Sequence, residues 1–256
     1  MNIKDIYPKS LEDFISNTLS YQNEGLIRLY RGQEHNWFPA PKVLRIANDR
    51  KVNPLKLETK IFDNFKNQAL IFHKDVIHYS PLEKLTLAQH FGLPTRLLDW
   101  TTNPLIAIWF ACQGNQSIAN QDRVVWGYGI YEEEVSKINP KNPFSSNLIR
   151  FFKPNNIDQR ISAQDSWFSI HPIQVVNGVL DKQRGDGLPH FNKIETFENN
   201  SNFYFAKFHI NEDLVGEILE KLNLIGINYR TLFPSLEGLC NQIEWESNSY
   251  DFEEWN

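Results

Sequence analysis

Apolar residues recur at helical spacing in several parts of the chain. Within residues 1–22, Ser10 and Asp13 open a pattern that places Leu11, Phe14, Ile15 and Leu19 on one side of an N-terminal helix. Helical spacing with intervening charges over residues 54–77 predicts a long or broken surface helix. The same spacing predicts a helix capped by Asn211 and ended by Gly226, and a last helix that starts at Pro234 and Ser235.

Runs of branched and aromatic residues predict the strands. They cover LIRLYRGQ (26–33), RVVWGYGIY (123–131) and NFYFAKFHI (202–210). INYRTLF (227–233) is expected to be a short extended piece, residues 114–122 and 181–201 to be loops, and residues 245–256 to be a flexible acidic tail. Helices and strands do not alternate strictly. We therefore expect an α+β fold with a mixed or antiparallel sheet core and packed helices.

Composition narrows the class of protein. A chain of 256 residues with 41% apolar residues can build one large core, so we expect a single domain over residues 1–256. The net charge of −5 has the wrong sign for coating nucleic acid. Cys112 and Cys240 fit neither a disulfide framework nor a short-spaced metal site. With no secretion signal and no run long enough to span a bilayer, we expect a soluble cytoplasmic protein with no metal and no membrane contact.

A helix that is apolar on every side follows a cluster of polar residues. Asn103 and Pro104 start it, Gly114 ends it, and LIAIWFAC (105–112) predicts that protein surrounds it. Its free amides and partial positive charge face the preceding segment TRLLDWTT (95–102). They suit either capping side chains, with Thr101, Thr102 and Asp99 as candidates, or an anionic group of a ligand.

Two arginines are expected to need anionic partners. Arg31 shares a strand face with Ile27 and Leu29, and Arg96 precedes the run LLDW. A buried arginine is costly unless it is paired. On a strand, Arg96 and Asp99 would face opposite sides, so Asp99 is expected to pair with Arg31 and to leave Arg96 open for a ligand. The alternative is that these groups form internal structural ion pairs. His90 is either a satisfied buried histidine or a catalytic base.

Four blocks of the sequence together suggest a family. They are YRGQ (30–33) with Trp37 and LR (44–45), AQHFGLPTRLLDWTTNPLIAIWFAC (88–112), RISAQDSWFSIHP (160–172) and LFPSLEGL (232–239). The combination closely resembles the FRG domain family of bacteria, phages and some fungi, over nearly the whole chain. The third block departs from the usual form, because a glycine would be expected near Asp165 or Ser166.

A weaker similarity connects LYRG (29–32) and TTNPLIAIWFA (101–111) with ADP-ribosyltransferases. That resemblance implies that Arg31 holds the phosphate or ribose of NAD, and that Thr101 or Thr102 shapes the side of the nicotinamide ribose. The catalytic candidates are Arg31, Thr101 and Glu237. The candidates for ligand binding are Gly32, Gln33, His90, Thr95, Arg96, Asp99, Thr102 and Gln164.

The implied reaction releases nicotinamide through an oxocarbenium-like state, which a carboxylate would stabilise. Glu237 is the candidate, although an acidic residue in the first turn of a helix is also favoured by the helix dipole. Gln164 lies in the right order along the chain but is not a carboxylate.

Two functions stay open at this point. One is an NAD-using ADP-ribosyltransferase or NAD glycohydrolase, acting as a bacterial or phage toxin or antiphage effector on a protein or nucleic-acid acceptor. The other is a non-catalytic module that binds a nucleotide or a phosphate ligand in phage–host conflict. Whether the chain is an enzyme is not decided by its sequence.

Overall fold

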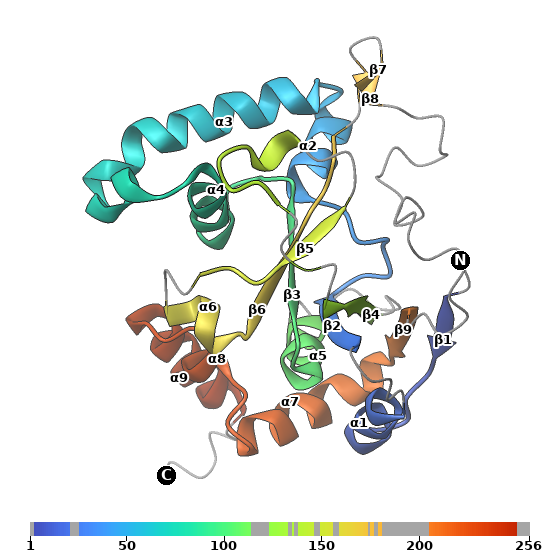
Figure 1. Ribbon diagram of the computed structural model, residues 1–256. Helices are drawn as coiled ribbons and strands as arrows, with labels where there is room; N and C mark the ends of the chain where they lie inside the picture. Colours follow the sequence, from blue (N-terminus) through green and yellow to red (C-terminus); the bar gives the residue numbers. More distant parts are fainter. Residues whose placement is uncertain are drawn as a thin grey trace.

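The fold is built on one mixed sheet. The computed structural model describes residues 3–20, 26–113, 123–132, 135, 138–145, 149–155, 159–173, 175–176, 179–180 and 205–249. Seven strands form the sheet in the order β1-β9-β4-β2-β3-β6-β5, with β1 parallel to β9 and the other pairs antiparallel (Figure 1). Their bounds are β1 Lys4–Ile6, β2 Leu26–Gln33, β3 Leu97–Thr101, β4 Arg123–Tyr131, β5 Arg150–Phe152, β6 Ser166–Ile170 and β9 Phe205–Ile210. β7 (Val175–Val176) and β8 (Val179–Leu180) form a separate hairpin.

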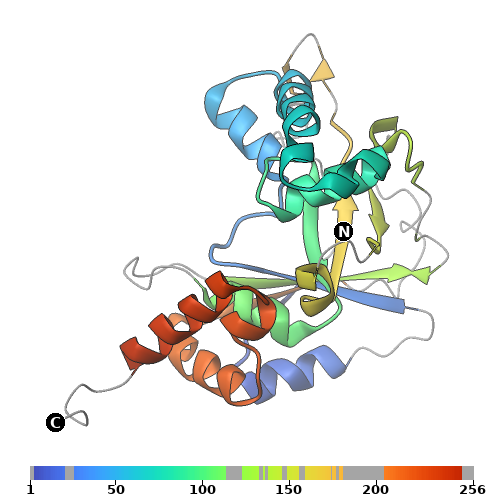
Figure 2. The same cartoon turned by 90° about the vertical axis from the view of Figure 1, so that its left-hand side faces the viewer.

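The helices form two groups on either side of the central strands. The first group is α2 (Lys42–Arg50), α3 (Pro54–Gln68) and α4 (Pro81–His90). The second group is α1 (Leu11–Leu19), α5 (Pro104–Cys112), α7 (Val215–Leu224), α8 (Tyr229–Leu232) and α9 (Leu236–Ser249). In Figure 2 the first group lies above the strands and the second group below them. The short helix α6 (Gln159–Ala163) leads into β6.

The expected fold class is confirmed, because helices pack on a mixed sheet. The strands at 26–33 and 123–131, the N-terminal helix and the helix after Asn211 all form. The helix predicted over 54–77 is broken: α3 ends at Gln68, and two 3-10 turns, Ala69–Ile71 and Lys74–His78, follow it. Cys112 is buried and Cys240 exposed, and both are free thiols. Among the described residues, no helix has the length and apolar character that crossing a membrane requires.

Two predictions near the C-terminus need correction. INYRTLF is not extended, because the Asn228 side chain accepts a hydrogen bond from Thr231 N and the two residues form a capping box that starts α8. The tail does not begin at residue 245, because α9 continues to Ser249. The residues after Ser249, and the loops expected at 114–122 and 181–201, lie outside the described part of the chain.

Helix α5 is enclosed, as its sequence predicts. Ile106, Ala107, Ile108 and most of its other residues are buried against β2, β4, β9 and α7. The buried guanidinium of Arg123 satisfies the C-terminal end of this helix, with Nη1 donating to Ala111 O at 3.1 Å and to Gln113 O at 2.5 Å. Carbonyl groups at the end of the helix, which would otherwise lack a hydrogen-bond donor, therefore bind a charged one.

Strand β2 touches α5 backbone to backbone at Gly32. A Cβ at this position would lie 1.9 Å from Ala107 O and 2.6 Å from Ala111 N. Neither atom belongs to a side chain that could move aside. The glycine of the YRG sequence is therefore required by close approach of a strand to a helix.

We expect Gly32→Ala to lower the free energy of unfolding by about 3 kcal/mol, because the added methyl group must push β2 away from α5. Urea denaturation followed by circular dichroism measures the change. Gly216→Ala in α7 is the matched control, since a Cβ there meets nothing within 4 Å and alanine favours a helix by about 0.5–1 kcal/mol. Equal stability of the two variants would contradict the assignment.

Candidate functional site

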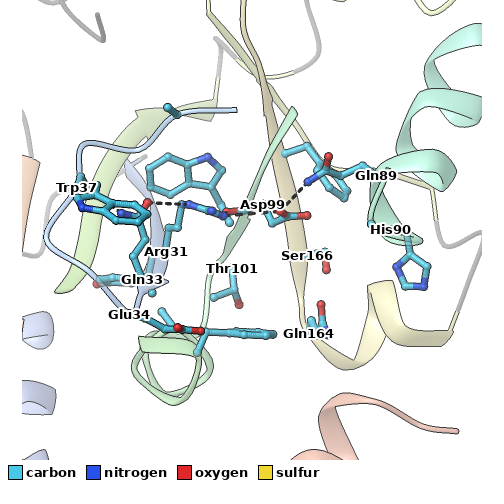
Figure 3. A pocket seen from close by; sticks show the side chains of 18 of the residues that line it. Arg31, Gln33, Glu34, Trp37, Gln89, His90, Asp99, Thr101, Gln164 and Ser166 are labelled. Carbon is cyan, nitrogen blue, oxygen red and sulfur yellow. Dashed lines mark hydrogen bonds and ion pairs between the residues drawn. The ribbon is translucent and has the colours of Figure 1, made fainter. Parts of the chain in front are cut away.

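A cavity of about 570 Å³ opens between the two groups of helices. Strands β2, β3 and β6 line it together with the loop after β2, α2, the end of α4, α5 and the end of α6 (Figure 3). The lining residues with polar or charged side chains include Arg31, Gln33, Glu34, His35, Arg45, Gln89, His90, Asp99, Thr101, Arg160, Gln164 and Ser166. Tyr30, Trp37, Phe38, Trp100, Phe110 and Phe168 add aromatic surface.

The cavity exists because two neighbouring strands diverge. β2 and β3 pair only at Tyr30 and Thr101, whereas β2 pairs with β4 along eight residues. Arg31 follows directly after the pairing point. Its Nη1 donates to the main-chain oxygen of Asp99 at 2.9 Å, so a side chain takes the place of the missing ladder hydrogen bond. The divergence leaves Arg31 in the opening, with its side chain 19% exposed.

Asp99 and Gln33 hold one side of the Arg31 guanidinium. Nη1 lies 3.6 Å from Asp99 Oδ2, and Nε donates to Gln33 Oε1 at 3.3 Å. The ion pair expected between Arg31 and Asp99 is confirmed. Gln89 Nε2 in turn donates to Asp99 Oδ2 at 2.8 Å and fixes that carboxylate. Nη2 of Arg31 makes no hydrogen bond with the described residues.

A second guanidinium stands near the first. Arg45 of α2 lines the cavity, and its side chain makes no hydrogen bond or ion pair within the described part of the chain. Burial lowers the pKa of Arg31, Asp99 opposes that shift, and the positive charge of Arg45 adds to it. With Arg160 as a third, three arginines face two carboxylates, Glu34 and Asp99. The cavity wall therefore favours an anion.

The N-terminus of α5 is capped mainly by its own first residue. Asn103 Oδ1 accepts from Leu105 N at 2.9 Å, and Thr101 Oγ1 accepts from Asn103 N at 3.1 Å. Thr101 thus takes part as expected, and it also lines the cavity. The expectation that Asp99 or Thr102 caps the helix is wrong. Asp99 binds Arg31, and the Thr102 hydroxyl donates to Asp165.

Arg96 is not available to a ligand, because it is paired with Glu58. Its Nη2 lies 2.6 Å from Glu58 Oε2, Nε donates to the same carboxylate at 2.9 Å, and its backbone amide donates to Oε1 at 3.0 Å. Both side chains are about 95% buried, and the guanidinium also stacks on Phe144 at 4.7 Å. The prediction of an open Arg96 is therefore wrong. Glu58 lies 38 positions away on α3 and was not indicated by the sequence.

Other predicted residues lie outside the cavity lining. Thr95 is buried, and its hydroxyl donates to Gln89 Oε1 at 2.6 Å, so it supports Asp99 through Gln89. Thr102 and Asp165 bind each other. Glu237 lies in the first turn of α9 and does not line the cavity. Seven of the predicted residues do line it, namely Arg31, Gly32, Gln33, His90, Asp99, Thr101 and Gln164.

The third sequence block owes its geometry to Asp165. This residue has a positive φ of 45°, a left-handed conformation that glycine adopts most easily. A glycine expected near this position is explained by that backbone. The turn brings Gln164 and Ser166 to the cavity wall. Gln164 Nε2 donates to Leu232 O at 3.1 Å, which ties α6 to α8.

A buried hydrogen-bond chain lies behind Trp100. Its indole Nε1 donates to Ser169 Oγ at 2.9 Å, and that hydroxyl lies 2.8 Å from His171 Nε2. Burial lowers the pKa of His171 to about 3, with the positive charges of Arg31 and Arg96 adding to the shift. The imidazole is therefore neutral at physiological pH, and it adds no positive charge beside the arginines.

Several lining residues were missed by sequence reasoning, notably Glu34, Arg45, Gln89, Arg160 and Ser166. Glu34 directly follows YRGQ, and the others stand inside the quoted blocks, but no spacing pointed to their side chains. Only the path of the loop after β2 brings Glu34 and Arg45 to the same opening.

Comparison with protein families identifies a similarity over part of this chain. The model of the FRG domain matches residues 27–120, as the resemblance of the first two sequence blocks predicts. The matched segment contains the first two sequence blocks, and the blocks at 160–172 and 232–239 lie beyond it. No curated protein and no solved structure matches the chain. The weaker similarity to ADP-ribosyltransferases stays a prediction.

We expect Glu58→Gln to lower the free energy of unfolding by about 3–5 kcal/mol, because the buried charge of Arg96 loses its partner. Chemical denaturation measures the loss. Asp63→Asn on the same helix is the control, since its pair with Lys66 is exposed and should leave stability almost unchanged. If Glu58→Gln were as stable as the control variant, the Arg96 pair would not be structural.

Proposed function

We propose that the cavity binds NAD and breaks the bond between nicotinamide and ribose, either by transfer of ADP-ribose to an acceptor or by hydrolysis. One observation carries the proposal. Asp99 and Gln33 fix one side of the Arg31 guanidinium, while its Nη2 has no partner among the described residues. Arg31 shares the opening with Arg45, whose side chain is not paired with any described residue. A diphosphate would satisfy both guanidinium groups.

The size and lining of the cavity support a nucleotide as the ligand. A volume of about 570 Å³ lies within the range of small-molecule sites. Trp37, Phe110 and Phe168 offer apolar surface to flat rings, whereas Thr101, Gln164 and Ser166 offer hydrogen bonds to ribose hydroxyls. Figure 3 shows the labelled polar side chains gathered around one space, with Arg31 and Asp99 next to each other and joined by a dashed line.

The reaction needs a carboxylate, and we assign it to Glu34. When the bond from ribose C1′ to the nicotinamide nitrogen breaks, its electron pair leaves with neutral nicotinamide, and positive charge develops on the ribose. A nearby carboxylate stabilises that charge. The attacking oxygen, from water or an acceptor, then bonds to C1′ and releases its proton to solvent. Asp99 is engaged by Arg31 and Gln89, whereas Glu34 lines the cavity without an ion pair to any described residue.

A second function, non-catalytic binding of a nucleotide or phosphate ligand, has its own supporting observation. Gln164 and Ser166, at the start of β6, present neutral side chains to the cavity. The carboxylate of Glu237 lies in the first turn of α9 and does not line the cavity. Arg31 and Arg45 would serve such a module equally well. Nicotinamide release separates the two functions, because only the enzyme produces it.

We expect Glu34→Gln to lower the rate of nicotinamide release by about 10²–10³-fold, because the amide cannot offset developing positive charge. Chromatography of the products measures the rate, and calorimetry should show little change in NAD affinity. Glu220→Gln on α7 is the control, because Glu220 is an exposed carboxylate outside the cavity. NAD binding without release by the wild-type protein would favour the non-catalytic module.

The toxin or antiphage role further requires that the wild-type protein, and not the Glu34→Gln variant, depletes NAD in a bacterial host.

We expect Arg31→Lys to weaken NAD binding by about tenfold or more, because lysine keeps the charge but loses the planar pair of donors. Isothermal titration calorimetry measures the affinity. Circular dichroism and thermal denaturation check that the variant is folded. A folded variant that binds NAD as tightly as the wild-type protein would show that Arg31 is purely structural.

A further inference from the structure

An exposed tryptophan stands at the cavity and has no packing role that explains it. Trp37 is 59% exposed and lines the cavity, whereas the chain buries Trp100, Trp109, Trp126 and Trp167. Its ring contacts His35 at a centroid distance of 4.5 Å. An aromatic face left open beside an anion-binding wall offers a surface on which a flat heterocycle can stack.

The loop that carries Trp37 is held at both ends. Gln33 Nε2 donates to Trp37 O at 2.8 Å, and Gln33 Oε1 accepts from Arg31 Nε at 3.3 Å. On the other side, Phe38 packs edge-on against Trp126 at 5.5 Å in the core of the sheet. Gln33 therefore joins the arginine and the tryptophan loop through one side chain (Figure 3). The backbone of Trp37 is therefore held in place relative to Arg31.

His35 adds an independent observation. Its Nδ1 is buried and has no hydrogen-bond partner among the described residues. An unsatisfied buried nitrogen costs free energy, and native structures rarely keep one without a reason. His35 also lines the cavity. His35 therefore lies beside Trp37 at the cavity, with one ring nitrogen that pairs with no described residue.

From these contacts we propose that Trp37 and His35 form a base-stacking subsite, and that Gln33 positions it at a set distance from Arg31. The inference rests on the proposed function, since it takes the ligand to be a nucleotide. It adds that the cavity recognises the heterocyclic base as well as the anion. The preferred ligands are nucleotides that carry a heterocyclic base, and sugar phosphates without a base bind more weakly.

AMP and ribose 5-phosphate test the subsite, because AMP carries adenine in place of the C1 hydroxyl of ribose 5-phosphate. Calorimetry on the wild-type protein should show AMP binding about tenfold more tightly, as stacking on an aromatic side chain provides. Trp37→Ala should abolish this difference and leave the affinity for ribose 5-phosphate unchanged. Trp37→Phe should keep most of it. Phe72→Ala is the control, since Phe72 is 87% exposed and lies outside the cavity lining.

Equal binding of AMP and ribose 5-phosphate to the wild-type protein would overturn the subsite, as would a Trp37→Ala variant that keeps the preference. Either result would leave NAD cleavage untouched, because nicotinamide release is measured separately. A preference for AMP without nicotinamide release would keep the subsite and reject the enzymatic proposal. Failure of both ligands and of NAD to bind would reject both proposals.

Discussion

Strands β2 and β3 share a single paired position, Tyr30 with Thr101, and then separate. Past that point the main-chain oxygen of Asp99 receives its hydrogen bond from the guanidinium of Arg31. The sheet keeps its backbone satisfied while an opening forms between two of its central strands. Gly32 keeps the far side of β2 against α5, since no side chain fits there. The cavity is thus a consequence of how two strands part, and Arg31 occupies the point of separation.

The arginines of this protein differ in how completely they are paired. Arg96 with Glu58, and Arg123 with Glu212 and the end of α5, have charged partners and are buried. Arg31 is paired on one side, and Arg45 has no ion pair with any described residue. A fully paired buried arginine contributes to specificity of the fold but offers nothing to a ligand. An arginine that is incompletely paired at a cavity can still gain binding free energy from a ligand, and the proposed site is therefore placed at Arg31 and Arg45.

The cavity extends beyond the segment that matches the FRG domain. Residues 27–120 provide Arg31, Glu34, Arg45 and Thr101, while Arg160, Gln164 and Ser166 come from later in the chain. β6 pairs with β3 and brings these later residues to the opposite wall. The segment that matches the FRG domain thus supplies Arg31 and Arg45, and the later segment supplies the wall that faces them.

The sequence alone determined the elements whose cause is local. Capping residues and apolar spacing predicted α1, α5 and α7, and runs of branched and aromatic residues predicted β2 and β4. It also predicted that Arg31 pairs with Asp99 across 68 positions, because a buried charge requires a partner. Only the tertiary structure decided that Glu58 neutralises Arg96, that Arg45 and Glu34 reach the cavity, and that Glu237 does not. Those outcomes depend on how α2, α3 and the loop after β2 pack against the sheet. Packing between distant segments leaves no periodic signal, so no spacing in the chain could indicate it.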